Sequence, residues 1–137
     1  TQIKPDEILT AIIIPKLPDK RYYHSYFKLG RRNAMNIARL SLCVMISFDK
    51  KENIKECFLV AGSLLNRPQR LTEIEEILVG QPLTDSIINE IDDPLKKIIK
   101  TEIGTRWSAV YKMPVFINLC KDALDEIKIQ KSIMSSL

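Results

Sequence analysis

The chain has 137 residues, enough for one domain whose core needs no disulfide or metal to hold it together. Hydrophobic residues make up 45% and charged residues 28%, and no apolar run reaches the roughly 20 residues of a membrane-spanning helix. The net charge of +4 is unevenly placed, because residues 16–39 hold seven lysines and arginines against one aspartate. One local basic block is not a binding stripe, so neither nucleic acid nor a membrane is an expected partner.

The first half of the chain reads as strands. Residues 7–14, EILTAIII, are rich in isoleucine and end at a proline, which predicts a first strand. Residues 21–29 alternate and predict a second strand, and residues 38–48 carry large apolar groups at every other position. Residues 54–61 return after the polar turn 49–53, so these last two strands are predicted to form a hairpin with a five-residue loop. The helices should cover the face that carries Leu42 and Val44.

The second half reads as helices. Thr72 with Glu75 fits a capping box and Gly80 fits the position after a helix end, which predicts a short helix over about 72–79. A second helix is expected from about Thr84, and Asp93 before a proline predicts that it breaks and restarts there. A last helix should open at 104–105 and run to about residue 128.

Strands grouped before helices favour an α+β fold over alternating βαβ units. We therefore expect a single domain over residues 1–137, with an antiparallel sheet of three to four strands followed by about three helices packed on one face. The three cysteines, Cys43, Cys57 and Cys120, are far apart in apolar surroundings and form no CxxC pair. They predict buried, reduced thiols in a cytoplasmic protein, with no disulfide framework and no metal site.

Catalysis finds little support in the residues. The one histidine, His24, has no nucleophile or carboxylate near it in sequence and is more simply a solvated strand residue. Asp92 and Asp93 are more simply groups at a helix start than paired catalytic carboxylates. The four glycines are isolated, so no phosphate-binding glycine loop is present. No catalytic residue is therefore predicted.

A basic corner stands out at the end of the second predicted strand. Lys28, Arg31 and Arg32 flank Gly30 and follow two aromatic residues at 26–27. Aromatic and cationic groups together suit a planar anionic ligand or a nucleotide edge. The alternative is a solvated strand end with ordinary surface charge, and these residues alone leave both readings open.

Several segments, in order, resemble one known family. They are EILTAIIIPKLP, YFKLGRRNAMNIA, the long strand pair, Pro68-x-Arg70 before the short helix, and GTRWSAVYK before the last helix. Together they resemble the C-terminal domain of the FAD-binding (medium) subunit of molybdenum hydroxylases, which include xanthine dehydrogenases and carbon monoxide dehydrogenases. The resemblance runs over about residues 5–128. Lys112 departs from it, because arginine is usual at that position.

The resemblance implies a role next to a flavin. In the family, two upstream domains with glycine-rich loops hold most of the FAD, and the C-terminal domain closes over one side of it. Electrons reach this FAD from molybdenum through iron–sulfur clusters on partner subunits and leave to an acceptor. Leu9 matches a leucine packed near the isoalloxazine, and Lys28 matches a lysine near the polar edge of the ring. The competing readings are plain strand core for Leu9 and an extended surface lysine for Lys28.

The resemblance also implies that this chain alone lacks functions of the complete subunit. The glycine-rich loops are not in these residues, so we expect a fragment of an oxidoreductase that lacks the upstream FAD-binding domains, binds FAD poorly and is inactive by itself. One alternative is a non-catalytic interaction domain of the same fold that has lost flavin binding. The other is a small basic nucleic-acid binder that uses Arg31, Arg32 and Arg39.

Overall fold

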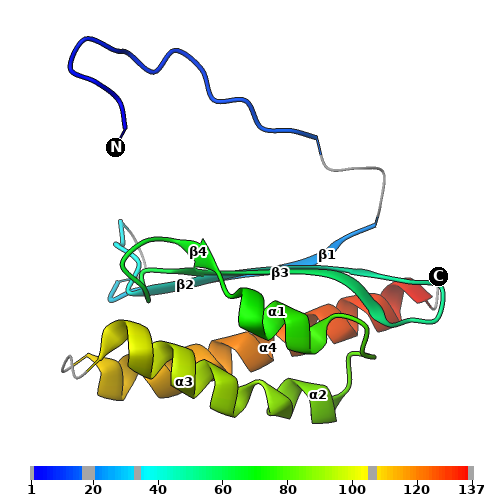
Figure 1. The fold of residues 1–137 in the computed structure, drawn as a ribbon. Coiled ribbons are helices and arrows are strands. Elements are labelled where there is room, and N and C mark those ends of the chain that lie inside the picture. The colour runs from blue at the N-terminus through cyan, green and yellow to red at the C-terminus, as the bar shows by residue number, and fades with distance from the viewer. Residues whose placement is uncertain (1, 17–20, 33–34, 105–107, 136–137) are drawn as a thin grey trace.

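The computed structural model describes residues 2–16, 21–32, 35–104 and 108–135, and these form a sheet layer over a helix layer (Figure 1). The elements are β1 (Tyr23–Leu29), β2 (Leu40–Phe48), β3 (Ile54–Gly62), β4 (Gln69–Arg70), α1 (Thr72–Leu78), α2 (Asp85–Glu90), α3 (Asp92–Ile103) and α4 (Ala109–Ser135). The strands form one antiparallel sheet in the order β1-β2-β3-β4. The predicted α+β fold is therefore confirmed, and among the described residues the helices number four.

The hairpin of β2 and β3 is built as its sequence predicts. Asp49 opens the turn, and its Oδ1 accepts hydrogen bonds from the backbone N–H groups of Lys51 (2.8 Å) and Asn53 (2.9 Å). A carboxylate that bonds its own backbone in this way stabilises a tight turn, which fixes the strand register on either side. Glu52 adopts a left-handed φ of 67° within the turn.

One face of the sheet is the core. Leu42 and Val44 of β2 are fully buried there, and α4 packs against β1 and β2 while α1 packs against β3. Phe116 and Leu124 of α4 are buried as well, since positions spaced by about four residues lie on one side of a helix. Each such side chain stabilises the fold by about 1.5–3 kcal/mol through burial. The prediction that helices cover the Leu42 and Val44 face is confirmed.

The short helix α1 lies where it was predicted, but its start differs. Leu71, not Thr72, is the N-cap residue, and no side chain caps it. The capping-box prediction is wrong because the Glu75 carboxylate bonds the Leu59 N–H and Arg70 and does not reach back to the helix start. Gly80 follows the helix with a φ of 85°, a left-handed conformation that favours glycine, as expected.

The break between the second and third helices is also confirmed, with shifted boundaries. Thr84 caps α2, and its hydroxyl accepts from the Ile87 N–H at 3.5 Å. Helix α3 begins at Asp92, so Asp93 is not the N-cap and Pro94 is the third helical residue. Proline costs little there, because the first backbone N–H groups of a helix have no partner within it. Asp92 instead binds Lys121 of α4 at 2.8 Å, which ties the two helices together.

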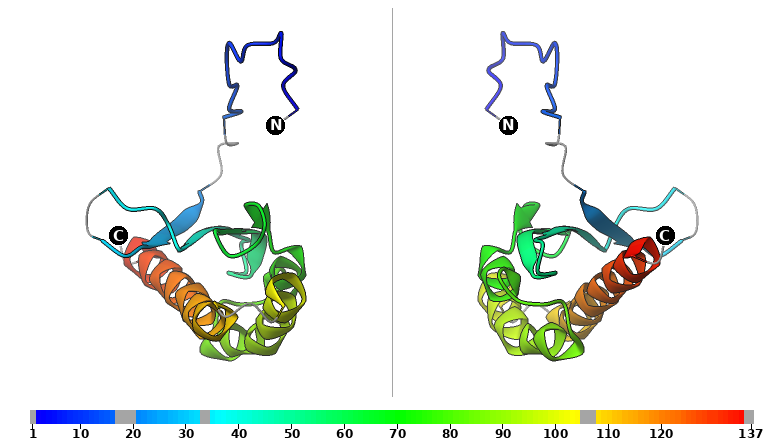
Figure 2. Two further views of the ribbon diagram at one scale, coloured as in Figure 1. Left: turned by 90° about the vertical axis from the view of Figure 1, so that its left-hand side faces the viewer. Right: turned by 90° about the vertical axis from the view of Figure 1, so that its right-hand side faces the viewer.

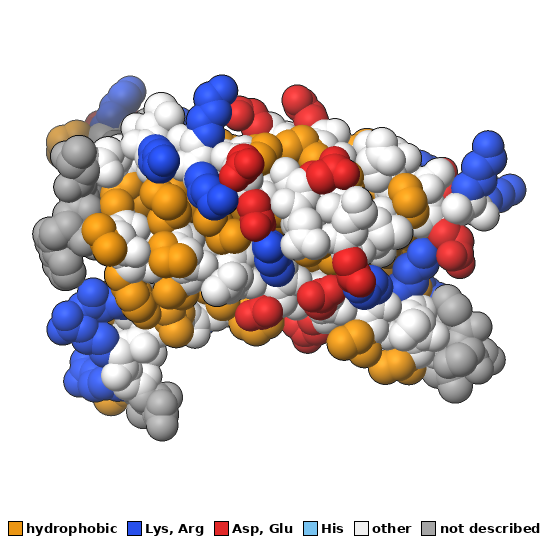
Figure 3. Space-filling view, turned by 90° about the horizontal axis from the view of Figure 1, so that it is seen from below, with side chains coloured by type: hydrophobic (Ala, Val, Ile, Leu, Met, Phe, Trp, Pro, Cys, Tyr) orange, Lys and Arg blue, Asp and Glu red, His pale blue; other side chains and the backbone are white. Residues whose placement is uncertain are grey.

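The last helix runs past its predicted end, to Ser135. Its predicted start at residue 105 lies outside the described residues. From the helical side, charged side chains of both signs are spread over the surface, and hydrophobic ones gather toward one end (Figure 3). Among the described residues no helix is long and apolar enough to cross a membrane.

The predicted strand over residues 7–14 is wrong for this chain. Residues 2–16 contain no strand, and they stand clear of the sheet in the views of Figures 1 and 2. A strand needs a neighbour for its backbone N–H and C=O groups, and no described strand pairs with this segment. The fourth strand of the sheet is the two-residue β4 instead. Residues 7–14 have the isoleucine-rich pattern of a strand, but no described strand pairs with them.

The three thiols are free, and the prediction that all of them are buried is wrong for Cys43. Cys57 and Cys120 are buried, whereas Cys43 is half-buried on the side of β2 that the helices do not cover. Burial, with the nearby Glu75 carboxylate, raises the pKa of Cys57 to about 12, and burial also raises the pKa of Cys120.

Candidate functional site

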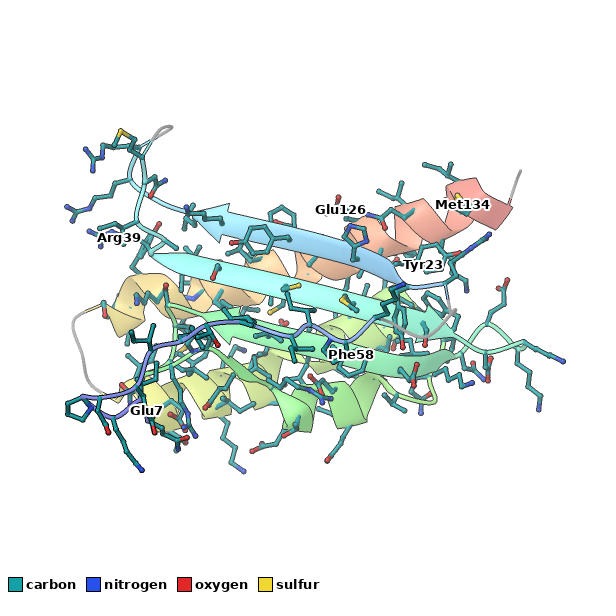
Figure 4. All side chains as sticks on the ribbon, turned by 90° about the horizontal axis from the view of Figure 1, so that it is seen from above. Glu7, Tyr23, Arg39, Phe58, Glu126 and Met134 are labelled. Carbon is teal, nitrogen blue, oxygen red and sulfur yellow. The ribbon has the colours of Figure 1, made fainter. Side chains whose placement is uncertain are left out.

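The side of the sheet opposite the helices forms a partly apolar surface, here called the open face. Strand register places Tyr26, Cys43 and Val60 in one row across β1, β2 and β3, and Met45 beside Phe58 in the next row. No described helix lies over this side of the sheet when it is seen from above (Figure 4). The N-terminal segment passes in front of the sheet in that view, but Figure 1 shows that it stands away from it.

Lys28 lies at one end of the open face, near the end of β1. It is exposed and sits opposite Ser41 of β2, which in turn sits opposite Gly62 of β3. A Cβ atom on Gly62 would come within 2.2 Å of the Ser41 hydroxyl oxygen, so glycine is what allows that hydroxyl to lie there. The row beside the lysine therefore carries only small side chains, which leaves room for a flat group to approach its ammonium.

Folding adds Arg39 and Lys112 to the basic corner of Lys28, Arg31 and Arg32, and the name covers all five residues from here on. The loop between β1 and β2 is closed at its base, where the Arg39 N–H donates to the Leu29 carbonyl at 2.7 Å. A hollow of about 450 Å³ lies here, lined by Arg31, Arg32, Arg39 and Lys112 together with Asn36, Ile37, Ala38 and Ser63. None of the described lining residues carries a carboxylate, so the hollow favours an anion.

Gly30 is required at this corner by a close contact. A Cβ atom at this position would fall within 1.7–2.0 Å of the Asn36 side-chain amide, so any other residue would displace that amide. The Asn36 Nδ2 group donates to the Arg32 carbonyl at 2.6 Å and holds the loop in place. Met35, at a left-handed φ of 48°, turns the chain back toward β2.

The fourth lining cation comes from a segment far away in sequence. Lys112, in the first turn of α4, donates from Nζ to the Ser63 carbonyl just after β3, at 2.7 Å. This bond ties the start of the long helix to the sheet end beside the arginines. Sequence reasoning noted Lys112 only as a departure from arginine and did not place it beside Arg31 and Arg39. Arg106 and Trp107, in the same motif, lie outside the described residues.

The proline-x-arginine motif has a structural role that sequence reasoning missed. Arg70 Nε and Nη2 bind the Glu75 carboxylate at 3.0 and 2.5 Å, and Glu75 is only 4% exposed. The Leu59 N–H of β3 donates to the same carboxylate at 2.8 Å. The Arg70 guanidinium also lies 4.7 Å from the centre of the Phe58 ring. One ion pair therefore joins α1, β3 and β4 and supports Phe58 on the open face.

The two predicted flavin residues are both exposed. Lys28 ends the open face, whereas Leu9 is 60% exposed in the segment that stands apart from the sheet. The structure does not bring the two side chains together, and their role at a flavin stays a prediction. His24 is exposed on its strand, as expected. Within the described ranges, no group of three or more His, Cys, Asp or Glu side chains is arranged to hold a metal ion.

Comparison with known proteins defines the class. The sequence over residues 25–127 matches the family model of the CO dehydrogenase flavoprotein C-terminal domain. The chain belongs to this family, and the resemblance drawn from its motifs is confirmed.

Curated relatives agree with this assignment. The chain is 26% identical over 130 residues to "Nicotinate dehydrogenase FAD-subunit" of Eubacterium barkeri. This alignment covers 92% of this chain and 44% of that protein. It is 26% identical over 127 residues to "Glyceraldehyde dehydrogenase medium chain" of Sulfolobus acidocaldarius, with 93% and 44% covered. The chain thus spans less than half the length of the curated relatives that it matches.

Solved structures agree on the fold. A chain of carbon monoxide dehydrogenase from Hydrogenophaga pseudoflava superposes with a TM-score of 0.69 at 18% identity, covering 85% of this chain and 39% of that one. A chain of reconstituted CO dehydrogenase from Oligotropha carboxidovorans gives 0.66 at 18% identity, covering 79% and 37%. At this level of identity the likeness concerns the fold.

Proposed function

We propose that this chain is the C-terminal domain of the FAD-binding subunit of a molybdenum hydroxylase-type dehydrogenase, in which it closes over one side of the flavin. The observation that carries the proposal is the match of residues 25–127 to a flavoprotein domain. A relative named as an FAD-subunit, aligned over 92% of this chain, supports it. The parent subunit would also contain upstream domains that hold most of the FAD.

The residues present fit a planar, anionic group. Lys28 supplies an exposed ammonium at the edge of the sheet, beside the small residues Ser41 and Gly62. When bound, FAD would accept electrons that originate at molybdenum and reach it through iron–sulfur clusters on partner subunits, and it would pass them to an acceptor. The Lys28 ammonium would stabilise negative charge on the ring, because opposite charges a few ångströms apart attract.

The basic corner extends this positive field away from the ring. Arg31, Arg32, Arg39 and Lys112 all line its hollow. These four cations, with no carboxylate among the described lining residues, raise the local concentration of anions near the sheet end. Leu9 would pack against the ring only when the N-terminal segment is held by the upstream domains. The free thiols fit a reducing, cytoplasmic setting.

Titration with FAD tests whether this chain only covers the flavin while upstream domains bind it. We expect the chain alone to show no stoichiometric binding of FAD by fluorescence quenching, because it lacks a phosphate-holding loop. The full-length subunit should bind one FAD. Tight, stoichiometric binding by the chain alone would contradict the proposed covering role. A full-length subunit without FAD would favour an interaction domain that has kept the fold and lost the flavin.

A further inference from the structure

We propose that the hollow of the basic corner is a binding site for a small molecule that carries a diphosphate group. Arg31, Arg32, Arg39 and Lys112 line this hollow of about 450 Å³. Lys28 lines a neighbouring hollow of about 620 Å³, which shares Arg32 with the first. The inference goes beyond the proposed function, because the lysine proposed for the flavin is not among the described residues that line the diphosphate site.

The arginines of the hollow carry charge that no described carboxylate compensates. Arg31, Arg32 and Arg39 make no side-chain hydrogen bond or ion pair with a described residue, whereas Arg70 elsewhere on the chain is paired with Glu75. Arg39 is half-buried, so water solvates its guanidinium only in part. Like charges gathered around one space repel one another, and an anion bound among them would relieve that repulsion. These arginines are therefore available to an anionic ligand.

Backbone contacts hold two of the cations at the hollow. The Arg39 N–H donates to the Leu29 carbonyl at 2.7 Å, which fixes this residue at the end of the sheet (Figure 4). Lys112 Nζ donates to the Ser63 carbonyl at 2.7 Å, and an ammonium has two further hydrogens to donate. Ser63 and Met35 adopt left-handed φ angles of 59° and 48°, which are costly for residues other than glycine and cluster at ligand-binding sites. Cations held in place in this way lower the cost of binding an anion between them.

The number and kind of cations indicate a phosphate ligand. A guanidinium group forms two parallel hydrogen bonds with phosphate oxygens, and several cations together match a group with several negative charges close together, as in a diphosphate. The volume lies within the roughly 300–1,000 Å³ of small-molecule sites. Ile37, which is 85% exposed, lines the same hollow and offers an apolar contact to a group attached to the diphosphate. A nucleic acid would need a longer basic stripe, whereas charges of both signs are mixed over the helical surface (Figure 3).

Isothermal titration calorimetry with sodium pyrophosphate tests the site in the full-length subunit with its flavin bound. Arg39→Gln and Arg31→Gln each remove one lining guanidinium and should weaken pyrophosphate binding by about tenfold or more, because charge-assisted hydrogen bonds to phosphate are strong. Arg21→Gln is the matched control, since it makes the same change in net charge at an exposed position before the opposite end of β1. It should weaken pyrophosphate binding by less than about twofold.

Two further measurements separate folding and ligand class from the effect of the arginines. Far-ultraviolet circular dichroism checks that each variant folds, and Arg31→Gln, at an exposed loop position, keeps the test decisive if Arg39→Gln does not fold. ADP and adenosine are titrated in the same way as pyrophosphate. Arginine-dependent binding of ADP at least as tight as that of pyrophosphate would identify a nucleoside diphosphate as the ligand. Weaker binding of ADP would identify free diphosphate, and both results support a diphosphate site.

Three results would overturn the inference. They are a lack of binding of both pyrophosphate and ADP, equal weakening by Arg21→Gln and the two lining variants, and binding of adenosine as tight as that of ADP. Any of these in a subunit that binds its FAD would refute the diphosphate site and leave the proposed function standing. Arginine-dependent binding of pyrophosphate in a subunit that binds no FAD would support the diphosphate site while refuting the proposed function.

Discussion

The two faces of the sheet differ in what covers them: one packs against the helices, and the other is the open face. On β2, Ile46 points to the helices and is fully buried, while its neighbour Met45 points to the open face and is only partly covered. Alternation from Leu40 to Ile46 of β2 separates buried from partly exposed side chains at every position. The helical face can therefore hold the fold by itself, which leaves the open face and its basic end free to contact something else.

The largest expected effect on the free energy of unfolding comes from comparing substitutions at two adjacent residues of β2, one on each face. Ile46→Ala should destabilise the chain by about 2–5 kcal/mol, because it leaves a cavity in a packed core. Met45→Ala should cost about 1 kcal/mol or less, since its side chain is already partly in water. Urea unfolding followed by circular dichroism measures both. Similar losses for the two variants would mean that the open face is part of the core of this domain.

The second effect concerns the ion pair between Arg70 of β4 and the buried Glu75 of α1. Arg70→Leu should destabilise the chain by about 1–3 kcal/mol, because it leaves the buried Glu75 carboxylate without its cation. Lys96→Leu, which removes the exposed Asp93–Lys96 pair, is the matched control and should cost about 0.5 kcal/mol or less. The same unfolding measurement applies. If the control variant lost as much as the Arg70 variant, the buried pair would have no special structural role.

The third effect uses the pKa of a thiol on the helical side. Cys57 has a folded pKa of about 12 against an ordinary value of 9.0, so the folded chain holds the thiol proton more tightly than the unfolded one. Its contribution to stability is complete below about pH 9 and is lost as the pH rises toward 12. We expect a loss of about 1 kcal/mol near pH 10 from this group. Cys57→Ala should remove that part of the alkaline loss, and an unchanged pH profile would contradict the burial of the thiol.

Local pattern was enough for the parts of the fold whose partners lie nearby in sequence. The β2–β3 hairpin follows from alternation and from the turn at Asp49, and α1 follows from its periodicity and Gly80. Glu75 misled the capping prediction because its true partners, Arg70 and the Leu59 N–H, are chosen by tertiary packing. Residues 7–14 misled the strand prediction because a sequence shows the propensity for a strand but not whether a partner strand is present.

Some residues of the candidate site could likewise be predicted from the sequence, whereas others could not. The basic residues at positions 28–39 could be found by reading along the chain. Lys112 and Ser63 could not, because only folding brings α4 and the end of β3 beside the β1–β2 loop. The apolar continuity of the open face also needed the strand register, since Tyr26, Cys43 and Val60 are far apart in sequence. The flavin role proposed for Lys28 rests on family resemblance and not on its chemistry.

The smallest effect on stability carries the sharpest functional test. Lys28→Ala should change the free energy of unfolding by about 0.5 kcal/mol or less, because the side chain is exposed on a strand end. In the full-length subunit it should lower the flavin reduction potential by roughly 20 mV or more, since unit charges about 4 Å apart attract by ~1 kcal/mol even in water. Lys50→Ala, in the exposed turn after β2, is the matched control and should leave the potential unchanged. Spectroelectrochemical titration measures the potential, and stopped-flow reoxidation measures the rate. The variant could instead keep the wild-type potential and turnover while binding FAD. In that case the native Lys28 ammonium lies too far from the ring to act on it, and Lys28 has no role at the flavin.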